Sequence, residues 1–176
     1  GFDLGFERAG FRVEWQVEID DYCRRILGKH WPTVPCHYDI RAIDWQFVPR
    51  VDVVVGGFPC QPFSVAGHQR GEGDDRYLWP EVARCVAEVR PDWGVFENVP
   101  GLVTMGLDQV LSDLESLGYE VTTLVIPACA VDAPHRRDRV WIVAHAEGLT
   151  ERTGLRSDIQ TKERRRRSGD GGRTGG

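Results

Sequence analysis

Residues 51–64 read Val-Asp-Val-Val-Val-Gly-Gly-Phe-Pro-Cys-Gln-Pro-Phe-Ser, a short β-branched run that leads into glycines, prolines and a cysteine. Such a run is typical of a buried parallel strand, and open α/β sheets carry their functional groups in the loops that follow the carboxyl ends of these strands. The two prolines fix φ and the glycines allow additional dihedrals, so the loop has a defined shape. The pattern therefore places Cys60 where a nucleophile would lie.

A free cysteine is more often a small buried hydrophobic residue than a nucleophile. We expect that structural role for Cys23, Cys36, Cys85 and Cys129, which lie in or beside apolar segments. The total of five is odd and includes no Cys-x-x-Cys pair, which favours reduced thiols in a cytoplasmic protein and argues against a zinc site.

Two further polar clusters border strand-like segments. Glu97 and Asn98 follow Val95-Phe96, and the cluster His135-Arg136-Arg137-Asp138-Arg139 precedes the apolar run 140–143. Arg137 and Arg139 flank Asp138, so we expect them to point to one side of an extended backbone. Three strand-associated loops thus offer a thiol, a carboxylate and a group of cations.

Helical and strand-like segments alternate along the chain, which predicts an α/β fold with a mostly parallel sheet. We expect the late strands 119–126 and 140–144 to be able to pair as an antiparallel hairpin at one edge of the sheet. The other predicted strands are 11–17, 51–55 and 93–96, and the predicted helices are 2–9, the segment from Asp20 or Asp21 to His30, 79–89 and 107–117.

The blocks Pro59-Cys60-Gln61, Glu97-Asn98-Val99 and Arg136-Arg137-Asp138-Arg139-Val140 resemble, in order and spacing, the signature motifs of the DNA (cytosine-5)-methyltransferases. The resemblance extends from Gly1 to about Val143. It implies a Rossmann-like S-adenosylmethionine-dependent methyltransferase fold and transfer of a methyl group to carbon 5 of cytosine in double-stranded DNA, in a bacterial or phage restriction-modification or orphan methylation context.

The resemblance also implies roles for individual residues. Cys60 attacks carbon 6 of a cytosine flipped out of the duplex, and Glu97 contacts the ring edge and shares a proton with N3. Arg139 holds the cytosine carbonyl oxygen and Arg137 helps to organise the pocket. Gln61 and Asn98 support the site.

The implied methyl donor is S-adenosylmethionine. A carboxylate after the second strand, here Glu18, would hold the ribose diol, as in other nucleotide-binding α/β folds. Ile19 would face the adenine, and Asp39 would accept from the adenine amino group. The full expected set is Glu18, Ile19, Asp39, Ile40, Pro59 and Leu78.

Composition is that of a globular protein, with 41% hydrophobic and 28% charged residues. No apolar run approaches the ~20 residues of a membrane span, so we expect no membrane partner. The net charge of −5 is unevenly distributed, because residues 147–176 carry eight Lys or Arg against five Asp or Glu. We expect a partial catalytic domain over 1–146 and a disordered basic tail over 147–176.

Some expected features of the family are missing, and other functions stay open. A glycine-rich turn and a first strand are expected before Phe2, and a target-recognition region after His145, so we expect a chain truncated at both ends. An inactive remnant that binds nucleic acid passively is one alternative. A cysteine hydrolase that pairs Cys60 with His68 or His135 is another. The oligomeric state and the DNA recognition sequence are not indicated.

Overall fold

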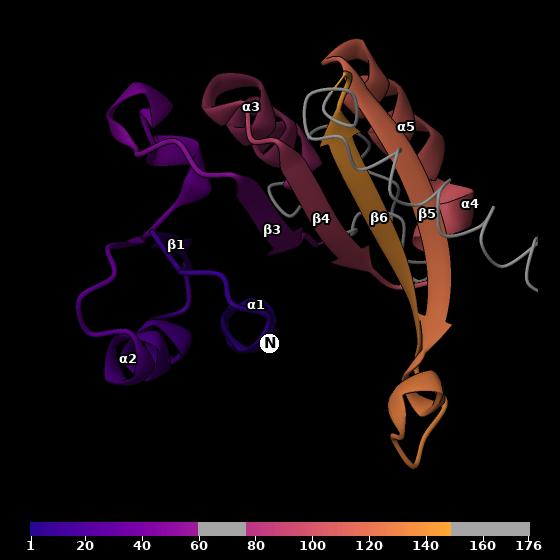
Figure 1. The fold of residues 1–176 in the computed structure, drawn as a ribbon, viewed down its shortest axis with the longest axis horizontal. Helices are drawn as coiled ribbons and strands as arrows, with labels where there is room; N and C mark the ends of the chain where they lie inside the picture. Colours follow the sequence, from indigo (N-terminus) through magenta and orange to yellow (C-terminus); the bar gives the residue numbers. More distant parts are fainter. Residues whose placement is uncertain (60–76, 149–176) are drawn as a thin grey trace, which may run out of the picture.

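The computed structural model describes residues 1–59 and 77–148, which form helices packed on two small sheets (Figure 1). The helices are α1 (Phe2–Arg8), α2 (Asp21–His30), α3 (Trp79–Val89), α4 (Leu102–Met105) and α5 (Leu107–Ser116). The strands are β1 (Gln16–Val17), β2 (Cys36–His37), β3 (Val53–Gly57), β4 (Trp93–Asn98), β5 (Tyr119–Pro127) and β6 (Asp138–Ala146). Short 3-10 turns cover Ile40–Ala42, Trp45–Phe47 and Ala128–Val131.

The larger sheet has the strand order β3-β4-β6-β5. Strand β3 runs parallel to β4, while β6 pairs antiparallel with both β4 and β5. The expected hairpin of the last two strands is therefore confirmed, with β5 at the edge. In this arrangement the carboxyl ends of β3 and β4 and the start of β6 meet at one end of the sheet.

One face of this sheet forms the core with α3 and α5. Alternate residues of β4 and β6 are buried, among them Phe96, Val140 and Ile142. The ring of Trp79, the first residue of α3, packs edge-on against Phe96 with a centroid distance of 5.8 Å. Burial of large apolar side chains of this kind is the main force that holds helix to sheet.

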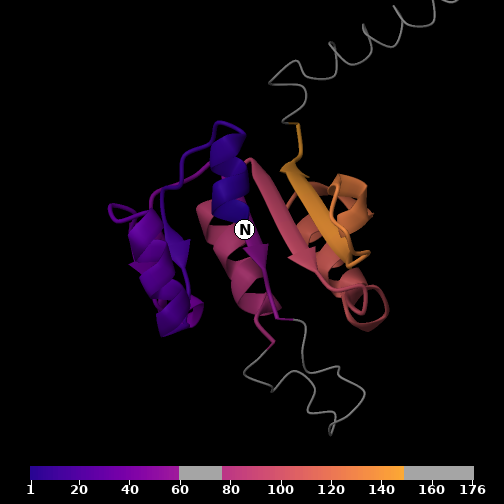
Figure 2. The same cartoon turned by 90° about the horizontal axis from the view of Figure 1, so that it is seen from below.

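The opposite face of the sheet is covered in part by α1. Phe2 packs against Trp141 of β6 with a ring centroid distance of 5.7 Å. Because successive side chains of a strand point to opposite faces, Trp141 lies on the face away from Ile142 and the core helices. In both ribbon views α1 lies between the β1-α2-β2 unit and the larger sheet (Figure 2).

Strands β1 and β2 form a separate parallel pair, and β1 does not pair with β3. The strand predicted over 11–17 is consequently reduced to Gln16–Val17, because β2 is the only strand that pairs with it among the described residues. The helix predicted after it begins as expected: Asp20 is its N-cap and accepts a hydrogen bond from the backbone N–H of Cys23 at 2.8 Å.

Across the ranges 1–59 and 77–148, none of the helices has the length and apolar character that crossing a membrane requires.

Candidate active site

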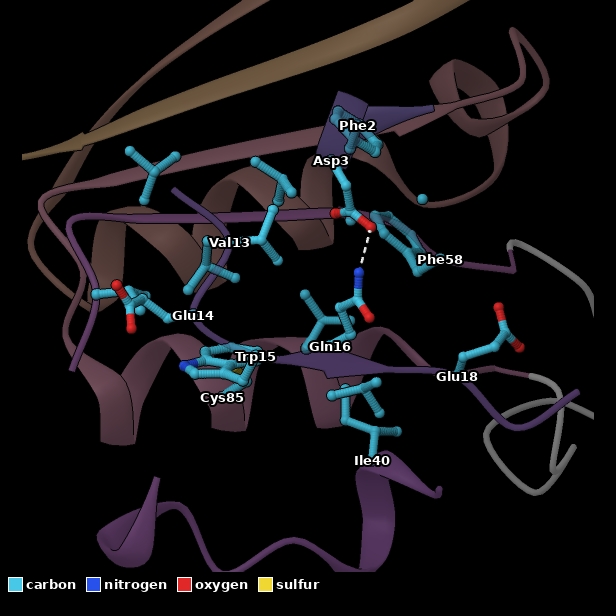
Figure 3. A pocket seen from close by; sticks show the side chains of 18 of the residues that line it. Phe2, Asp3, Val13, Glu14, Trp15, Gln16, Glu18, Ile40, Phe58 and Cys85 are labelled. Carbon is cyan, nitrogen blue, oxygen red and sulfur yellow. Dashed lines mark hydrogen bonds between the residues drawn. The ribbon is translucent and has the colours of Figure 1, made fainter. Parts of the chain in front are cut away.

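A cavity of about 1250 Å³ lies between β1 and β3 (Figure 3). All six residues expected to bind the methyl donor line it, although they come from four separate parts of the chain. These are Glu18, Ile19, Asp39, Ile40, Pro59 and Leu78. The parallel alternation of β1, α2 and β2 explains this convergence, because it brings the segments after β1 and β2 to the same edge.

Glu18 follows β1 directly and lies toward one end of the cavity. Its backbone N–H donates to the carbonyl of His37 at 3.1 Å, which extends the pairing of β1 with β2. Its Oε1 accepts from the N–H of Asp20 at 2.9 Å. One carboxylate oxygen thus orients the side chain, and the second is available to accept from a hydroxyl of a bound molecule.

Asp39 lines the cavity as expected, and its carboxylate is paired with Arg41. Its two oxygens accept four hydrogen bonds from Arg41, at 3.0 to 3.2 Å, through the backbone N–H, Nε and Nη2. The Arg41 side chain, followed by its backbone N–H, lowers the pKa of Asp39, so the carboxylate stays ionised. We did not predict the pairing of Asp39 with Arg41. The sequence signal that could have indicated it is the Asp-x-Arg spacing.

Glu97 and Arg139 meet across β4 and β6. Arg139 Nε lies 2.5 Å from Glu97 Oε1, and the two side chains are only 20% and 27% exposed. Gly57 of β3 pairs in register with Glu97, and a Cβ atom at Gly57 would lie 3.2 Å from Glu97 Oε2. Glycine at this position therefore leaves room for the carboxylate. The structure places the predicted acid and one predicted cation in direct contact at the end of the sheet where β3 and β4 terminate.

Arg137 does not lie in the extended backbone that we expected for it. It precedes β6 by one residue, has a φ of 37° and is exposed. Its carbonyl and that of Arg136 accept from the N–H of Ala128, at 3.2 and 2.6 Å, which closes the loop between β5 and β6. The expected alternation of Arg137 with Arg139 on one side of a strand is therefore not present, because this turn interrupts the strand.

Asn98 connects the end of β4 to the segment that leads to Cys60. It is 5% exposed, and its Nδ2 donates to the carbonyl of Phe58 at 2.9 Å. Its Oδ1 accepts from the N–H of Val99 at 2.9 Å, so both ends of the amide are bonded. Cys60 and Gln61, as well as His68, lie outside the described residues. The structure thus shows Asn98 holding the backbone of Phe58, two residues before Cys60 in the sequence.

The expectation that four cysteines are buried is correct only for Cys85. Cys85 is 3% exposed and lines the cavity, Cys36 is half-buried, and Cys23 and Cys129 are exposed. The periodicity of the sequence did not distinguish the buried cysteine from the exposed ones, because the residues that cover a helix face are distant in the sequence. Among residues 1–59 and 77–148 no three His, Cys, Asp or Glu side chains lie close enough together to hold a metal ion.

We expect Cys85 to be inert toward alkylating reagents in the folded chain. Burial raises the pKa of its thiol to about 12, so at pH 8 only ~10⁻⁴ of the molecules would carry a thiolate. Iodoacetamide labelling followed by peptide mass spectrometry should modify the exposed Cys129 at least about 10²-fold faster than Cys85. Denaturant should remove most of the difference. Equal rates in the native state would contradict the burial of Cys85.

Comparison with solved structures shows that the chain has the Rossmann-like fold found in known methyltransferases. A DNMT2 mutant of Spodoptera frugiperda superimposes with a TM-score of 0.68 at 18% identity, over 82% of this chain and 46% of that one. A putative DNA modification methyltransferase encoded within an Escherichia coli prophage gives 0.68 at 24% identity, over 84% and 44%. At these identities the similarity establishes the fold.

The chain belongs to the C-5 cytosine-specific DNA methylase family, whose model matches residues 1–170. It is 34% identical over 152 residues to the Type II methyltransferase M.AplI of Arthrospira platensis, covering 82% of this chain and 42% of the relative. It is 38% identical over 157 residues to M.HgiBI of Herpetosiphon aurantiacus, covering 85% and 36%. The chain therefore spans about two fifths of the length of these relatives.

Proposed function

We propose that the protein transfers a methyl group from S-adenosylmethionine to carbon 5 of cytosine in double-stranded DNA, in a bacterial or phage restriction-modification or orphan methylation context. Family membership supports the reaction class. The main structural support for the proposal is the contact between Glu97 and Arg139. Next to Glu97 in β4, Asn98 donates a hydrogen bond to the backbone of Phe58, two residues before Cys60.

The proposed chemistry begins with the low reactivity of cytosine. The thiolate of Cys60 adds to carbon 6 across the 5,6 double bond, and this addition makes carbon 5 nucleophilic, so that it takes up the methyl group. Loss of the proton on carbon 5 to a base then expels the Cys60 thiolate and restores the double bond. Glu97 shares a proton with N3 of the ring, which draws electrons away as the sulfur adds. Arg139 holds the carbonyl oxygen of the base. Since Glu97 and Arg139 form an ion pair, the flipped base would enter a site in which these two groups already lie together.

Supporting roles follow from the same geometry. Asn98 keeps the backbone at Phe58 in place and thereby positions the cysteine loop. The family resemblance assigns a supporting role to Gln61 as well, which lies outside the described residues. Arg137 contributes a cation from the turn before β6. We propose residues 1–146 as the catalytic part of the chain and the basic tail 147–176, almost all of which lies outside the described residues, as a nonspecific contact to DNA phosphates.

The cavity fits the methyl donor in its chemistry. A carboxylate at one end, from Glu18, suits a ribose diol, and the apolar side chains of Ile19, Ile40 and Leu78 suit a flat base. Pro59 adds a rigid wall beside Cys60, and Asp39 contributes a second carboxylate that Arg41 now occupies. When bound, S-adenosylmethionine supplies an electrophilic methyl group.

Replacing Glu18 by alanine should weaken S-adenosylmethionine binding about 10- to 100-fold, because a charge-assisted hydrogen bond to the ribose is lost. Isothermal titration calorimetry measures this loss, and thermal unfolding checks that the fold persists. Glu115→Ala, an exposed acid on α5, is the matched control and should leave the affinity unchanged. An unchanged affinity in Glu18→Ala would remove Glu18 from the cofactor site.

Labelled methyl transfer tests the proposed function itself. The full-length protein that contains this sequence is incubated with duplex DNA and S-adenosylmethionine carrying a labelled methyl group, and the DNA is digested to nucleosides for mass spectrometry. The label should appear in 5-methylcytosine. Label on an exocyclic amine would refute the carbon 5 assignment, and absence of label would favour an inactive remnant that binds nucleic acid passively.

A further inference from the structure

The segment that connects β2 to β3 carries part of the candidate cofactor site. It contains the short 3-10 turn Ile40–Ala42, which Asp39 precedes and Ile43 follows. The cavity-lining residues at this turn are Asp39, Ile40 and Arg41. The hydrogen bond that ends the turn, from the N–H of Ile43 to the carbonyl of Ile40, is long at 3.5 Å. A single turn of this kind has few hydrogen bonds of its own to fix its position.

Arg84 of α3 binds the carbonyl groups on both sides of this turn. Its Nη2 donates to the carbonyl of Ile40 at 2.8 Å, and its Nη1 donates to that of Ile43 at 3.0 Å. A guanidinium group is planar and presents its N–H groups in a fixed fork, so one rigid group determines where both carbonyls lie. The turn therefore takes its position from α3, which is distant in the sequence.

Two acids on the same face of α3 hold the guanidinium group of Arg84. Its Nε donates to Glu81 Oε2 at 2.8 Å, and its Nη1 lies 3.5 Å from Glu88 Oε1. Spacings of three and four residues place these side chains next to one another on a helix. Partly exposed ion pairs of this kind add little stability, but they restrict the directions in which the guanidinium can point.

The carboxylate of Asp39 is fixed to the same turn. Its Oδ1 accepts from the backbone N–H of Arg41 at 3.0 Å, and its Oδ2 accepts from Nη2 of Arg41 at 3.0 Å. The Asp39 side chain is still 24% exposed, and a carboxylate has about four acceptor sites, so it can accept from a further donor. A displacement of the turn would consequently move this carboxylate together with Ile40, which Figure 3 shows in the lining of the cavity.

We propose that Arg84 is a positioning residue for the methyl donor, because it holds the turn that carries Asp39 and Ile40. The inference rests on the proposed function, in which Asp39 accepts from the adenine amino group and Ile40 contacts the adenine ring. Arg84 is not among the described residues that line the cavity, so it acts on the ligand through the turn. Its loss should weaken the recognition of adenine more than the recognition of the rest of the ligand.

Two ligands that differ at position 6 of the purine test this role in the full-length protein that contains this sequence. S-adenosylhomocysteine has an amino group there, and S-inosylhomocysteine has a carbonyl oxygen, which cannot donate to Asp39. Isothermal titration calorimetry should show that the parent protein binds the adenosyl ligand about 10- to 100-fold more tightly. In Arg84→Gln this preference should fall about tenfold, because the carboxylate is no longer held where the amino group lies.

Arg90, which follows α3, provides the matched control. Its Nη1 donates to the carbonyl of Leu117 at 2.9 Å, a guanidinium–carbonyl bond of the same kind. Arg90 and Leu117 are both outside the set of described residues that line the cavity. Arg90→Gln should therefore keep the ligand preference of the parent, and thermal unfolding of both variants compares their losses of stability.

Arg84→Lys is the milder variant, because it keeps a cation beside Glu81. A single ammonium group cannot hold two carbonyls in one plane, so the preference should fall, but less than in Arg84→Gln. In steady-state kinetics both variants should raise the KM for S-adenosylmethionine with little change in kcat, since the residues proposed for the chemistry are untouched.

Several results would overturn the role of Arg84. These are the parent's preference in Arg84→Gln, equal weakening of both ligands in that variant, a parent protein that does not distinguish the ligands, or loss of folding in both Arg84 variants. Each of them leaves methyl transfer to carbon 5 of cytosine standing. A parent protein that binds neither ligand would refute the proposed cofactor, and the role of Arg84 with it.

Discussion

Cys60→Ser in the full-length protein that contains this sequence is expected to abolish methyl transfer, with a loss of about 10⁴-fold or more. A serine hydroxyl is a much weaker nucleophile than a thiolate and does not add to carbon 6 of the ring. The same substitution should eliminate the covalent complex with duplex DNA that carries 5-fluorocytosine, detected as a band that survives denaturing electrophoresis.

Cys129→Ser is the matched control for this experiment, because Cys129 is a free and exposed cysteine in the turn after β5. It should keep both activity and the covalent band. A Cys60→Ser protein that still forms the adduct would exclude Cys60 as the nucleophile, and the other cysteines would then be tested in turn.

Glu97→Gln is expected to lower the rate of methyl transfer by about 10²- to 10⁴-fold, the usual contribution of a general acid or base. The amide fills the same space and can donate a hydrogen bond to N3, but it cannot transfer a proton to the ring, and it makes a weaker bond to Arg139. Single-turnover kinetics with saturating DNA and S-adenosylmethionine separate this loss from a loss of binding.

The comparison for Glu97→Gln is Glu115→Gln, the same change of an exposed acid on α5. It should leave the rate unchanged, and both variants should bind S-adenosylmethionine as the parent does. A change of only a few-fold in the Glu97 variant would mean that the carboxylate pairs with Arg139 for structural reasons alone.

Local patterns predicted the elements that a single segment determines. The β-branched run before Gly56 predicted β3, the segment 79–89 was correctly expected to form a helix, and Asp20 was correctly expected as a possible helix cap. The family motifs indicated Glu97 and Arg139, which the structure brings into contact. These features could be predicted because they depend on the spacing of residues along the chain, which the sequence shows directly.

The features that the sequence did not reveal depend on residues distant in the chain. The sequence around Gln16 does not show that its side chain is buried with an oxygen that is unpaired among the described residues. Alternation of polar and apolar residues predicts a strand, but it does not tell which face of that strand is covered. The left-handed turn at Arg137 arises from closing the loop against Ala128. The shortness of β1 likewise follows from its lack of a second strand neighbour among the described residues, a property of the assembled sheet.

The neighbouring positions 97 and 98 of β4 impose a constraint on how this family can vary. Glu97 lies on the partly covered face and Asn98 on the buried face, in a strand whose burial alternates without interruption. Deleting a single residue earlier in β4 would exchange the two faces, placing the carboxylate among the core side chains and Phe96 on the partly covered face. Length changes during evolution should therefore be excluded from the interior of β4 and collect in the turns on either side of it, where an added residue leaves the alternation intact.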